Sequence, residues 1–229
     1  MKTKRRIALI LAVLATGLLC SCRGTHTEPD VSPAPEFDAA AYVRGGLDAV
    51  YLGRYSPEYL AMLGLSEEQC AAGYERGMAV SLDVFAEYFQ IDLAGCSESM
   101  RSELMQLMRD VYALASYEVG KVSPVNGGFS VEVTVRPIAA VKLAAENDYP
   151  AFAADAARRL ASGELSRGSS GFADWWAGQI AGMVRLRIAV PEYLDAQTVT
   201  VTLGKNADGI YAFSGTSLSD IDALILSYL

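Results

Sequence analysis

Two runs of strictly alternating residues constrain the fold of this 229-residue chain more than any other feature. In the first, "FSVEVTVRP" at 129–137, apolar residues alternate with polar ones, and Asn126-Gly127 just before it is a strong hairpin signal. In the second, "TVTVTL" at 198–203 leads through the turn "KNADG" to "IYAFS". Such strands have one apolar face, so each hairpin needs a covering layer on one side only.

Helical periodicity fills most of the remaining sequence. Pro57 suits the first turn of a short helix, and Ser66 with Gln69 forms a capping box at the start of a longer one. The predicted helices span about 37–53, 57–62, 66–89, 97–116, 149–162 and 171–189, and a last one begins at Ser217.

The predicted fold class is therefore α+β. We expect the two hairpins to meet edge to edge in one antiparallel four-stranded sheet, covered by helices on one face only. This arrangement is similar to the cystatin-like and nuclear-transport-factor-like folds, which host both enzymes and pure binding proteins.

The N-terminus carries an export signal. Four basic residues precede the apolar run Ile7–Leu19, which is too short to cross a bilayer and is typical of a signal peptide. The run ends in "LCSC", which resembles the lipobox of bacterial lipoproteins. That resemblance implies cleavage after Ser21 and attachment of acyl chains to Cys22. A rival register at Cys20 would put bulky Leu19 where a small residue is wanted.

Three segments follow from this prediction. Residues 1–21 form the signal peptide, and residues 22–36 form the lipidated cysteine with a polar, proline-rich segment that we expect to be a disordered tether. Residues 37–229 form a single extracytoplasmic domain, starting near Phe37. The predicted location is the outer face of the cell membrane, held by the lipid anchor.

Composition limits the function. Removal of the signal leaves 27 acidic and 15 basic residues, a net charge of −12, which repels nucleic acid. The sole histidine, His26, lies in the tether, so no Ser–His–Asp or Cys–His machinery fits in the domain. We expect no cofactor and no metal site, and Asn206–Gly209 is better explained as a hairpin turn than as a calcium loop.

Two carboxylate pairs and one tryptophan pair remain as candidate sites. Asp83 and Glu87 lie four apart on one helix, and Glu146 and Asp148 precede another. Acids on helix surfaces are common, so we do not expect a catalytic role for either pair. The adjacent residues 175 and 176, both tryptophan, point about 100° apart on a helix, so one can enter the core while the other lies at its margin.

Trp175 and Trp176 are accordingly the candidate ligand-binding residues, since an exposed indole stacks well on a sugar or a cation. The alternative is that both pack in the core. Cys70 and Cys96 are the remaining cysteines of the domain. We predict that they form no disulfide, because the long helix between them separates them by more than a disulfide spans.

Several stretches resemble a group of uncharacterised lipoproteins of Gram-positive bacteria: "GGLDAVYLGRY" at 45–55, "YEVGKV" at 117–122, "VEVTVRPI" at 131–138 and the C-terminal "DGIYAFSGTSLSDIDALIL". The resemblance implies a location but no activity. The function predicted from the sequence is a non-enzymatic domain that binds a small ligand or an envelope protein. The alternatives are a carboxylate-dependent cell-wall hydrolase and a transporter-associated binding protein.

Overall fold

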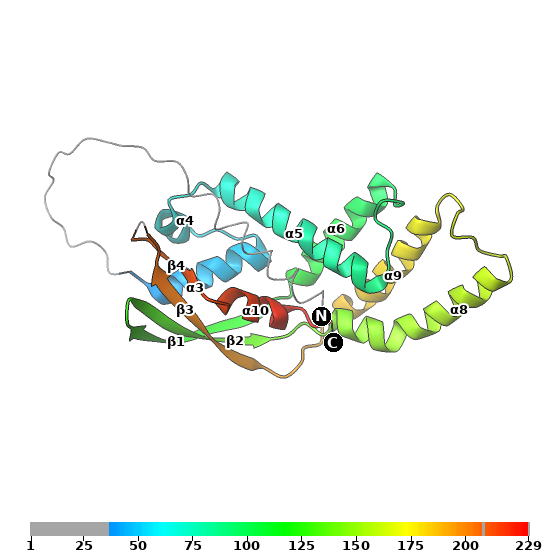
Figure 1. Cartoon of the computed structure of the whole chain (residues 1–229). Coiled ribbons are helices and arrows are strands. Elements are labelled where there is room, and N and C mark those ends of the chain that lie inside the picture. The colour runs from blue at the N-terminus through cyan, green and yellow to red at the C-terminus, as the bar shows by residue number, and fades with distance from the viewer. Residues whose placement is uncertain (1–36, 208, 229) are drawn as a thin grey trace, which may run out of the picture.

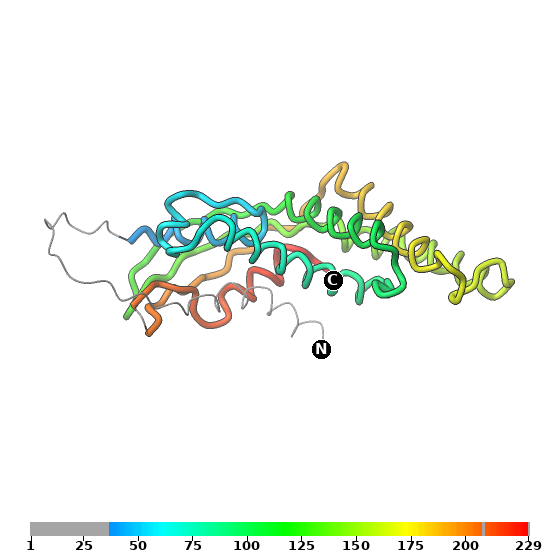
Figure 2. Tube along the Cα trace, turned by 90° about the horizontal axis from the view of Figure 1, so that it is seen from above, coloured from blue at the N-terminus to red at the C-terminus, as the bar shows by residue number. Residues whose placement is uncertain are grey.

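The computed structural model describes residues 37–207 and 209–228; Cys20, Cys22 and the tether lie outside them. The molecule is elongated, with the turns of both hairpins at one end and the helical hairpin of α8 (Tyr149–Ala161) and α9 (Phe172–Ala189) at the other (Figure 1 and Figure 2).

From residue 37 on, where the described structure starts, four helical segments precede the sheet. Helix α3 (Ala39–Leu47) continues into the π-helix η1 (Asp48–Leu52), and α4 (Pro57–Leu63), α5 (Glu67–Phe89) and α6 (Glu98–Tyr112) follow. The capping box is confirmed, because the Ser66 hydroxyl accepts the Gln69 N–H while the Gln69 side chain accepts the Ser66 N–H. Ser56 and Ser97 cap α4 and α6 in the same way through their hydroxyls.

The sheet confirms the predicted fold class. Strands β1 (Ser116–Val125), β2 (Gly128–Arg136), β3 (Gln197–Lys205) and β4 (Tyr211–Ser214) form one antiparallel sheet in the order β1-β2-β3-β4. The two hairpins meet through the β2–β3 pair, in which Val133 lies opposite Val199. Because apolar and polar residues alternate along the strands, the sheet has one apolar and one polar face. Buried side chains on the helix-covered face are Val131, Val133, Val135, Val201 and Leu203.

The polar face of the sheet has the predicted hydroxyl row. Thr134 and Thr198 lie opposite each other, with their Oγ1 atoms 2.8 Å apart. Thr200 and Thr202 continue the row on β3, and Glu132 and Arg136 flank it on β2. The helices that cover the sheet lie on its other side (Figure 1).

A helical excursion separates β2 from β3. It comprises α7 (Ala140–Leu143), the π-helix η2 (Ala144–Asp148), α8 (Tyr149–Ala161) and α9 (Phe172–Ala189). Helices α8 and α9 were predicted, but the helical turns over 140–148 were not. The terminal helix α10 (Ser217–Ile225) then packs against β3 and β2, where it buries Ile221 and Ile225.

Both cysteines of the domain behave as predicted. Cys70 lies in the first turn of α5 and Cys96 just before α6, and both thiols are buried and free. Burial raises the pKa of each thiol. They therefore pack as small apolar side chains.

Candidate ligand-binding site

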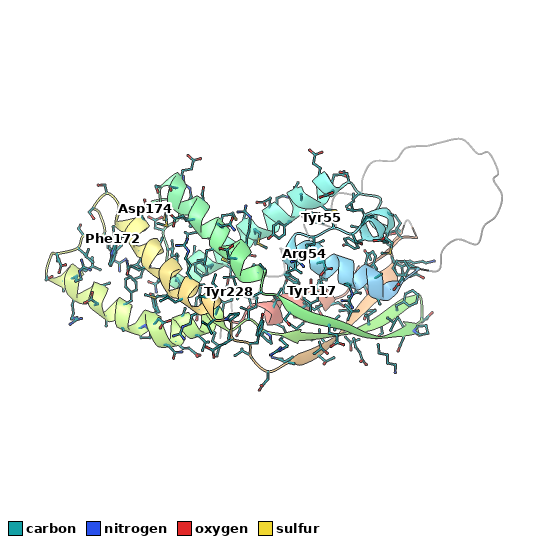
Figure 3. All side chains as sticks on the ribbon, turned by 180° about the vertical axis from the view of Figure 1, so that it is seen from behind. Arg54, Tyr55, Tyr117, Phe172, Asp174 and Tyr228 are labelled. Carbon is teal, nitrogen blue, oxygen red and sulfur yellow. The ribbon has the colours of Figure 1, made fainter. Side chains whose placement is uncertain are left out.

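A pocket of about 330 Å³ lies where the α5–α6 loop meets the α8–α9 loop, at the end of the molecule away from Phe37. We call it the distal pocket. Its lining consists of Gln90, Asp92, Gly95, Arg167, Ser169, Ser170, Gly171, Phe172, Ala173 and Trp176. Phe172 and Asp174 mark this end of the molecule in Figure 3.

The first wall of the pocket is the end of α5 and the turn after it. Gln90 ends the helix with φ of 57°, a left-handed conformation that glycine usually supplies. Asp92 then accepts the N–H of Gly95 through both its backbone and side-chain oxygens, at 3.1 and 3.2 Å. A Cβ atom at Gly95 would lie 2.6 Å from Asp92 Oδ2 and 3.2 Å from Ala173 Cβ, so the turn packs tightly against α9.

The second wall is the α8–α9 loop and the start of α9. Gly171 precedes the helix with φ of 87°, and no side chain caps the first N–H groups of α9. Asp174, in the first turn, accepts the backbone N–H of Ser97 at 2.7 Å. The hydrogen bonds from Ser97 lower the pKa of Asp174. This contact fastens the start of α9 to the start of α6 and so fixes the two walls relative to each other.

Trp176 and Phe172 supply the aromatic surface of the pocket. Trp176 is only 7% exposed, and its indole N–H donates to the Phe89 carbonyl at 3.0 Å. Its ring packs on Phe152, with centroids 4.8 Å apart. Trp175 is half-buried outside the lining, and the Arg159 guanidinium lies 5.5 Å from the centroid of its ring. The two indoles thus divide as a helix requires: Trp176 enters the core and meets the pocket, and Trp175 lies at the margin.

The polar groups of the pocket are of mixed charge. The Arg167 guanidinium lies 5.7 Å from the centroid of the Phe172 ring, and Asp92 contributes a carboxylate from the opposite wall. Ser169 donates its hydroxyl to the Ser166 carbonyl at 2.7 Å, which leaves its lone pairs as acceptors. Ring faces, one cation, one anion and hydroxyls together suit a small polar ligand that also has an apolar face.

The predicted carboxylate pairs do not converge on this pocket. Asp83 and Glu87 are exposed on α5. Glu146 pairs with Lys142 at 3.0 Å. Asp148 accepts two hydrogen bonds from Arg187, at 2.7 and 2.8 Å, which ties η2 to α9. These last two acids therefore hold helices together.

A second hollow, of about 340 Å³, lies on the outer side of α6 and is lined by Glu98, Arg101, Ser102, Met105 and Arg109. Its arginines are already engaged, since Arg101 donates to the Cys96 carbonyl at 2.5 Å and Arg109 pairs with Glu75 at 2.7 Å. Because these two arginines already bind groups of the protein, the second hollow has fewer free polar groups for a ligand than the distal pocket has.

Sequence reasoning missed a buried polar contact near the middle of the molecule. The Tyr51 hydroxyl of η1 donates to Asp222 Oδ1 of α10 at 2.5 Å, and Asp222 Oδ2 is buried without a hydrogen-bond partner in the described structure. Burial raises the pKa of Asp222 to about 7, although the hydrogen bond from Tyr51 opposes the shift. The Tyr112 ring stacks on Tyr51 at 6.0 Å, and its hydroxyl lies 3.3 Å from the Ser81 hydroxyl.

A second tyrosine–carboxylate contact comes from the same π-helix. The Tyr117 hydroxyl of β1 donates to Asp48 Oδ1 at 2.5 Å. Burial, with the Asp48 hydrogen bond, raises the pKa of Tyr117. Tyr117 and Tyr228 lie near the middle of the molecule in Figure 3, away from Phe172 and Asp174. Thus η1 is joined to β1 on one side and to α10 on the other.

No metal cluster and no membrane span are found among the described residues. Residues 37–207 and 209–228 bring no three His, Cys, Asp or Glu side chains into an arrangement suited to a metal ion. Asn206 instead accepts the Ile210 N–H at 3.0 Å, as a hairpin turn requires. Across the same residues, every helix is too short or too polar to cross a bilayer.

Comparison with known proteins identifies a likeness of fold. No protein-family model matches the sequence, and no curated protein matches it. Among solved structures, ycdA of Bacillus subtilis subsp. subtilis str. 168, a candidate lipoprotein, superimposes with a TM-score of 0.55 at 10% sequence identity. The match covers 82% of this chain and 56% of the ycdA chain, so this chain spans little more than half of its neighbour's length.

Proposed function

We propose that this protein is a lipid-anchored, extracytoplasmic and non-catalytic binding protein, attached through Cys22 and binding a small ligand in the distal pocket. The observation that carries the proposal is the lining of that pocket, in which the Phe172 and Trp176 rings lie beside Arg167 and Asp92. Such a combination orients a ligand and buries its apolar face. The lipobox-like "LCSC" and the fold shared with a candidate lipoprotein support the anchor.

The arrangement of the acids favours binding over cell-wall hydrolysis. A carboxylate-dependent hydrolase needs two acids that converge on one cleft. Glu146 and Asp148 are instead taken up by Lys142 and Arg187, and Asp83 and Glu87 lie on the exposed side of α5. The single antiparallel sheet also differs from the two-lobed α/β architecture of transporter-associated binding proteins.

Intrinsic fluorescence tests the pocket, because Trp175 and Trp176 are the two tryptophans of the chain and both lie in or beside it. The probe is a mixture of soluble muropeptides, which carry sugar faces, carboxylates and amines. We expect a saturable change in emission. Arg167→Ala should weaken binding about tenfold or more, because a charge-assisted hydrogen bond contributes about 1.5–3 kcal/mol.

The matched control is Arg158→Ala, which removes an exposed arginine of α8 that pairs with Asp155 outside the pocket lining. It should bind muropeptides as the wild type does. Equal loss in the two variants, or a flat titration of the wild-type protein, would contradict the proposal. Mass spectrometry of the same mixture after incubation checks the non-catalytic part, since cleaved muropeptides would show hydrolysis.

The anchor is tested separately. Cys22→Ala should abolish labelling by fatty acids and release the protein from membranes, whereas Cys20→Ala should change neither. If Cys20→Ala alone released the protein from membranes, the lipidated residue would be Cys20 and not Cys22.

A further inference from the structure

Exposed apolar side chains gather at the turns of the two hairpins. Val122 and Val125 at the end of β1 are 36% and 43% exposed, and Ile210 at the start of the β4 arm is 38% exposed. Two cations, Lys121 of β1 and Lys205 of β3, are exposed near the same turns.

The first residue of the domain is fixed at this same end. The Phe37 ring stacks on Tyr211 with centroids 4.1 Å apart and lies 5.7 Å from Phe129. Phe129 and Tyr211 are the first aromatic residues of β2 and β4, immediately beyond the two turns. The chain that leads back to Cys22 therefore enters the domain beside Val125 and Ile210.

We infer that the hairpin end, defined by Val122, Val125 and Ile210, is the surface that rests on the lipid bilayer. This inference rests on the proposed lipidation of Cys22. Fourteen residues lie between Cys22 and Phe37, so even a fully extended chain would place Phe37 within about 50 Å of the lipidated cysteine. The anchor therefore limits how far the hairpin end can move from the bilayer, whereas the distal pocket lies at the far end of the long axis (Figure 2).

The apolar side chains orient the protein; they do not recruit it. Each is only partly exposed, so its insertion transfers a fraction of a side chain's apolar area out of water. That is too little to hold a free domain on a bilayer. Once a lipid anchor holds the domain at the membrane, the same weak contacts are enough to favour one orientation of the domain over the others.

A more exposed apolar pair provides the internal control. Leu186 and Val190 are each 75% exposed, one turn apart at the end of α9. Val190 lies a few residues before Gln197, which pairs with Val135 at the end of the sheet opposite the hairpin turns. If exposure alone drew side chains to lipid, this pair would insert first. If the position of the tether determines which surface meets the bilayer, Leu186 and Val190 stay in water.

The experiment uses the lipidated full-length protein in phosphatidylethanolamine vesicles that contain phosphatidylglycerol. An environment-sensitive fluorophore is attached at Val125→Cys, Ile210→Cys or Leu186→Cys; Cys70 and Cys96 are 1% and 4% exposed and do not compete for the label in the folded protein. Lipids brominated in their acyl chains then quench any probe that inserts. We expect the probes at 125 and 210 to shift to shorter wavelength and to be quenched, and the probe at 186 to do neither.

Equal quenching at 125 and 186, or none at 125 and 210, overturns the inference. Flotation of the vesicles and the mass of the lipidated peptide are measured on the same samples. Protein that fails to float refutes the anchor itself, and with it the inference. Protein that floats with unquenched hairpin probes refutes only the orientation and leaves the proposed function standing.

Discussion

The distal pocket and the Tyr51–Asp222 contact both combine aromatic rings with a carboxylate, yet their polar groups are satisfied in opposite ways. In the pocket, Asp92 and Arg167 are exposed, and water solvates them when no ligand is present. Asp222 is only 7% exposed, and Tyr51 is its one hydrogen-bond donor in the described structure. The same chemical groups are thus open to solvent in one place and enclosed in a structural contact in the other.

The difference teaches that burial, more than residue type, separates a site from a structural contact. A carboxylate in water keeps its charge at little cost and remains available to a ligand. A carboxylate buried without a cation is strongly disfavoured as an anion, so it holds its proton. The two regions should therefore respond differently to pH and to substitution.

The largest effect is expected from pH and Asp222. Between the ordinary pKa of 3.8 and about 7, the folded protein keeps a proton on Asp222 that the unfolded chain has lost. This contribution to stability is complete below the lower value and is lost as pH rises through the upper one. About three pKa units correspond to a loss of about 4 kcal/mol. The Asp222→Asn variant keeps an acceptor for Tyr51 without the charge, so it should lack this loss.

Urea unfolding of the wild type and of Asp222→Asn at about pH 4.5 and about pH 8 measures this loss. Subtracting the variant's free energy of unfolding from that of the wild type at each pH cancels the contributions of all other titrating groups. Asp220→Asn, two residues away on the exposed side of α10, is the control and should track the wild type. A stability gap between Asp222→Asn and wild type that is the same at both pH values would break the comparison.

An effect of comparable size separates the two indoles beside the pocket. Trp176→Ala should lower the free energy of unfolding by about 3–5 kcal/mol, because it empties a core position and frees the Phe89 carbonyl. Trp175→Ala should cost less than half as much, since its ring is half-buried. Thermal and urea unfolding measure both. Equal costs would place Trp175 in the core as well.

A smaller effect is expected from Tyr51→Phe. Loss of the hydroxyl should cost about 1 kcal/mol and raise the pKa of Asp222 further, since the Tyr51 hydrogen bond favours the ionised carboxylate. The muropeptide titration should be unchanged. A weakened titration would mean that the buried contact and the pocket are coupled.

The smallest effect on stability is expected from Arg167→Ala. The side chain is exposed and its guanidinium lies over one face of the Phe172 ring, so the free energy of unfolding should change by less than about 0.5 kcal/mol. Muropeptide binding should nevertheless weaken about tenfold or more. A large loss of stability would make Arg167 a structural residue and weaken its assignment to recognition.

Local signals in the sequence were sufficient for most of the fold. The alternation around Asn126-Gly127 and over 198–203 predicted both hairpins, and the Ser66–Gln69 capping box predicted the start of α5. The helical turns over 140–148 were missed because this alanine-rich stretch has no amphipathic stripe, and half of it is a π-helix with a different period.

The candidate site was predictable only in part. Trp175 and Trp176 were identified because adjacent indoles on a helix must diverge, and Trp176 does line the pocket. The other wall comes from the α5–α6 loop, which is far away in sequence and carries no motif. The Tyr51–Asp222 contact joins residues 171 positions apart. One signal was available: Asp222 lies four residues after Leu218 and three before Ile225, on the apolar side of α10.

The β2–β3 pair also sets the order in which the chain can assemble. Each hairpin closes over a turn of a few residues, but the pairing of Val135 with Gln197 joins strands separated by the whole helical excursion. Closing so long a loop costs entropy before any contact repays it, so the central pair should form late. Until then the two hairpins are separate ribbons that expose unpaired edges to other chains. The newly made chain is thus most prone to aggregate before α9 has docked.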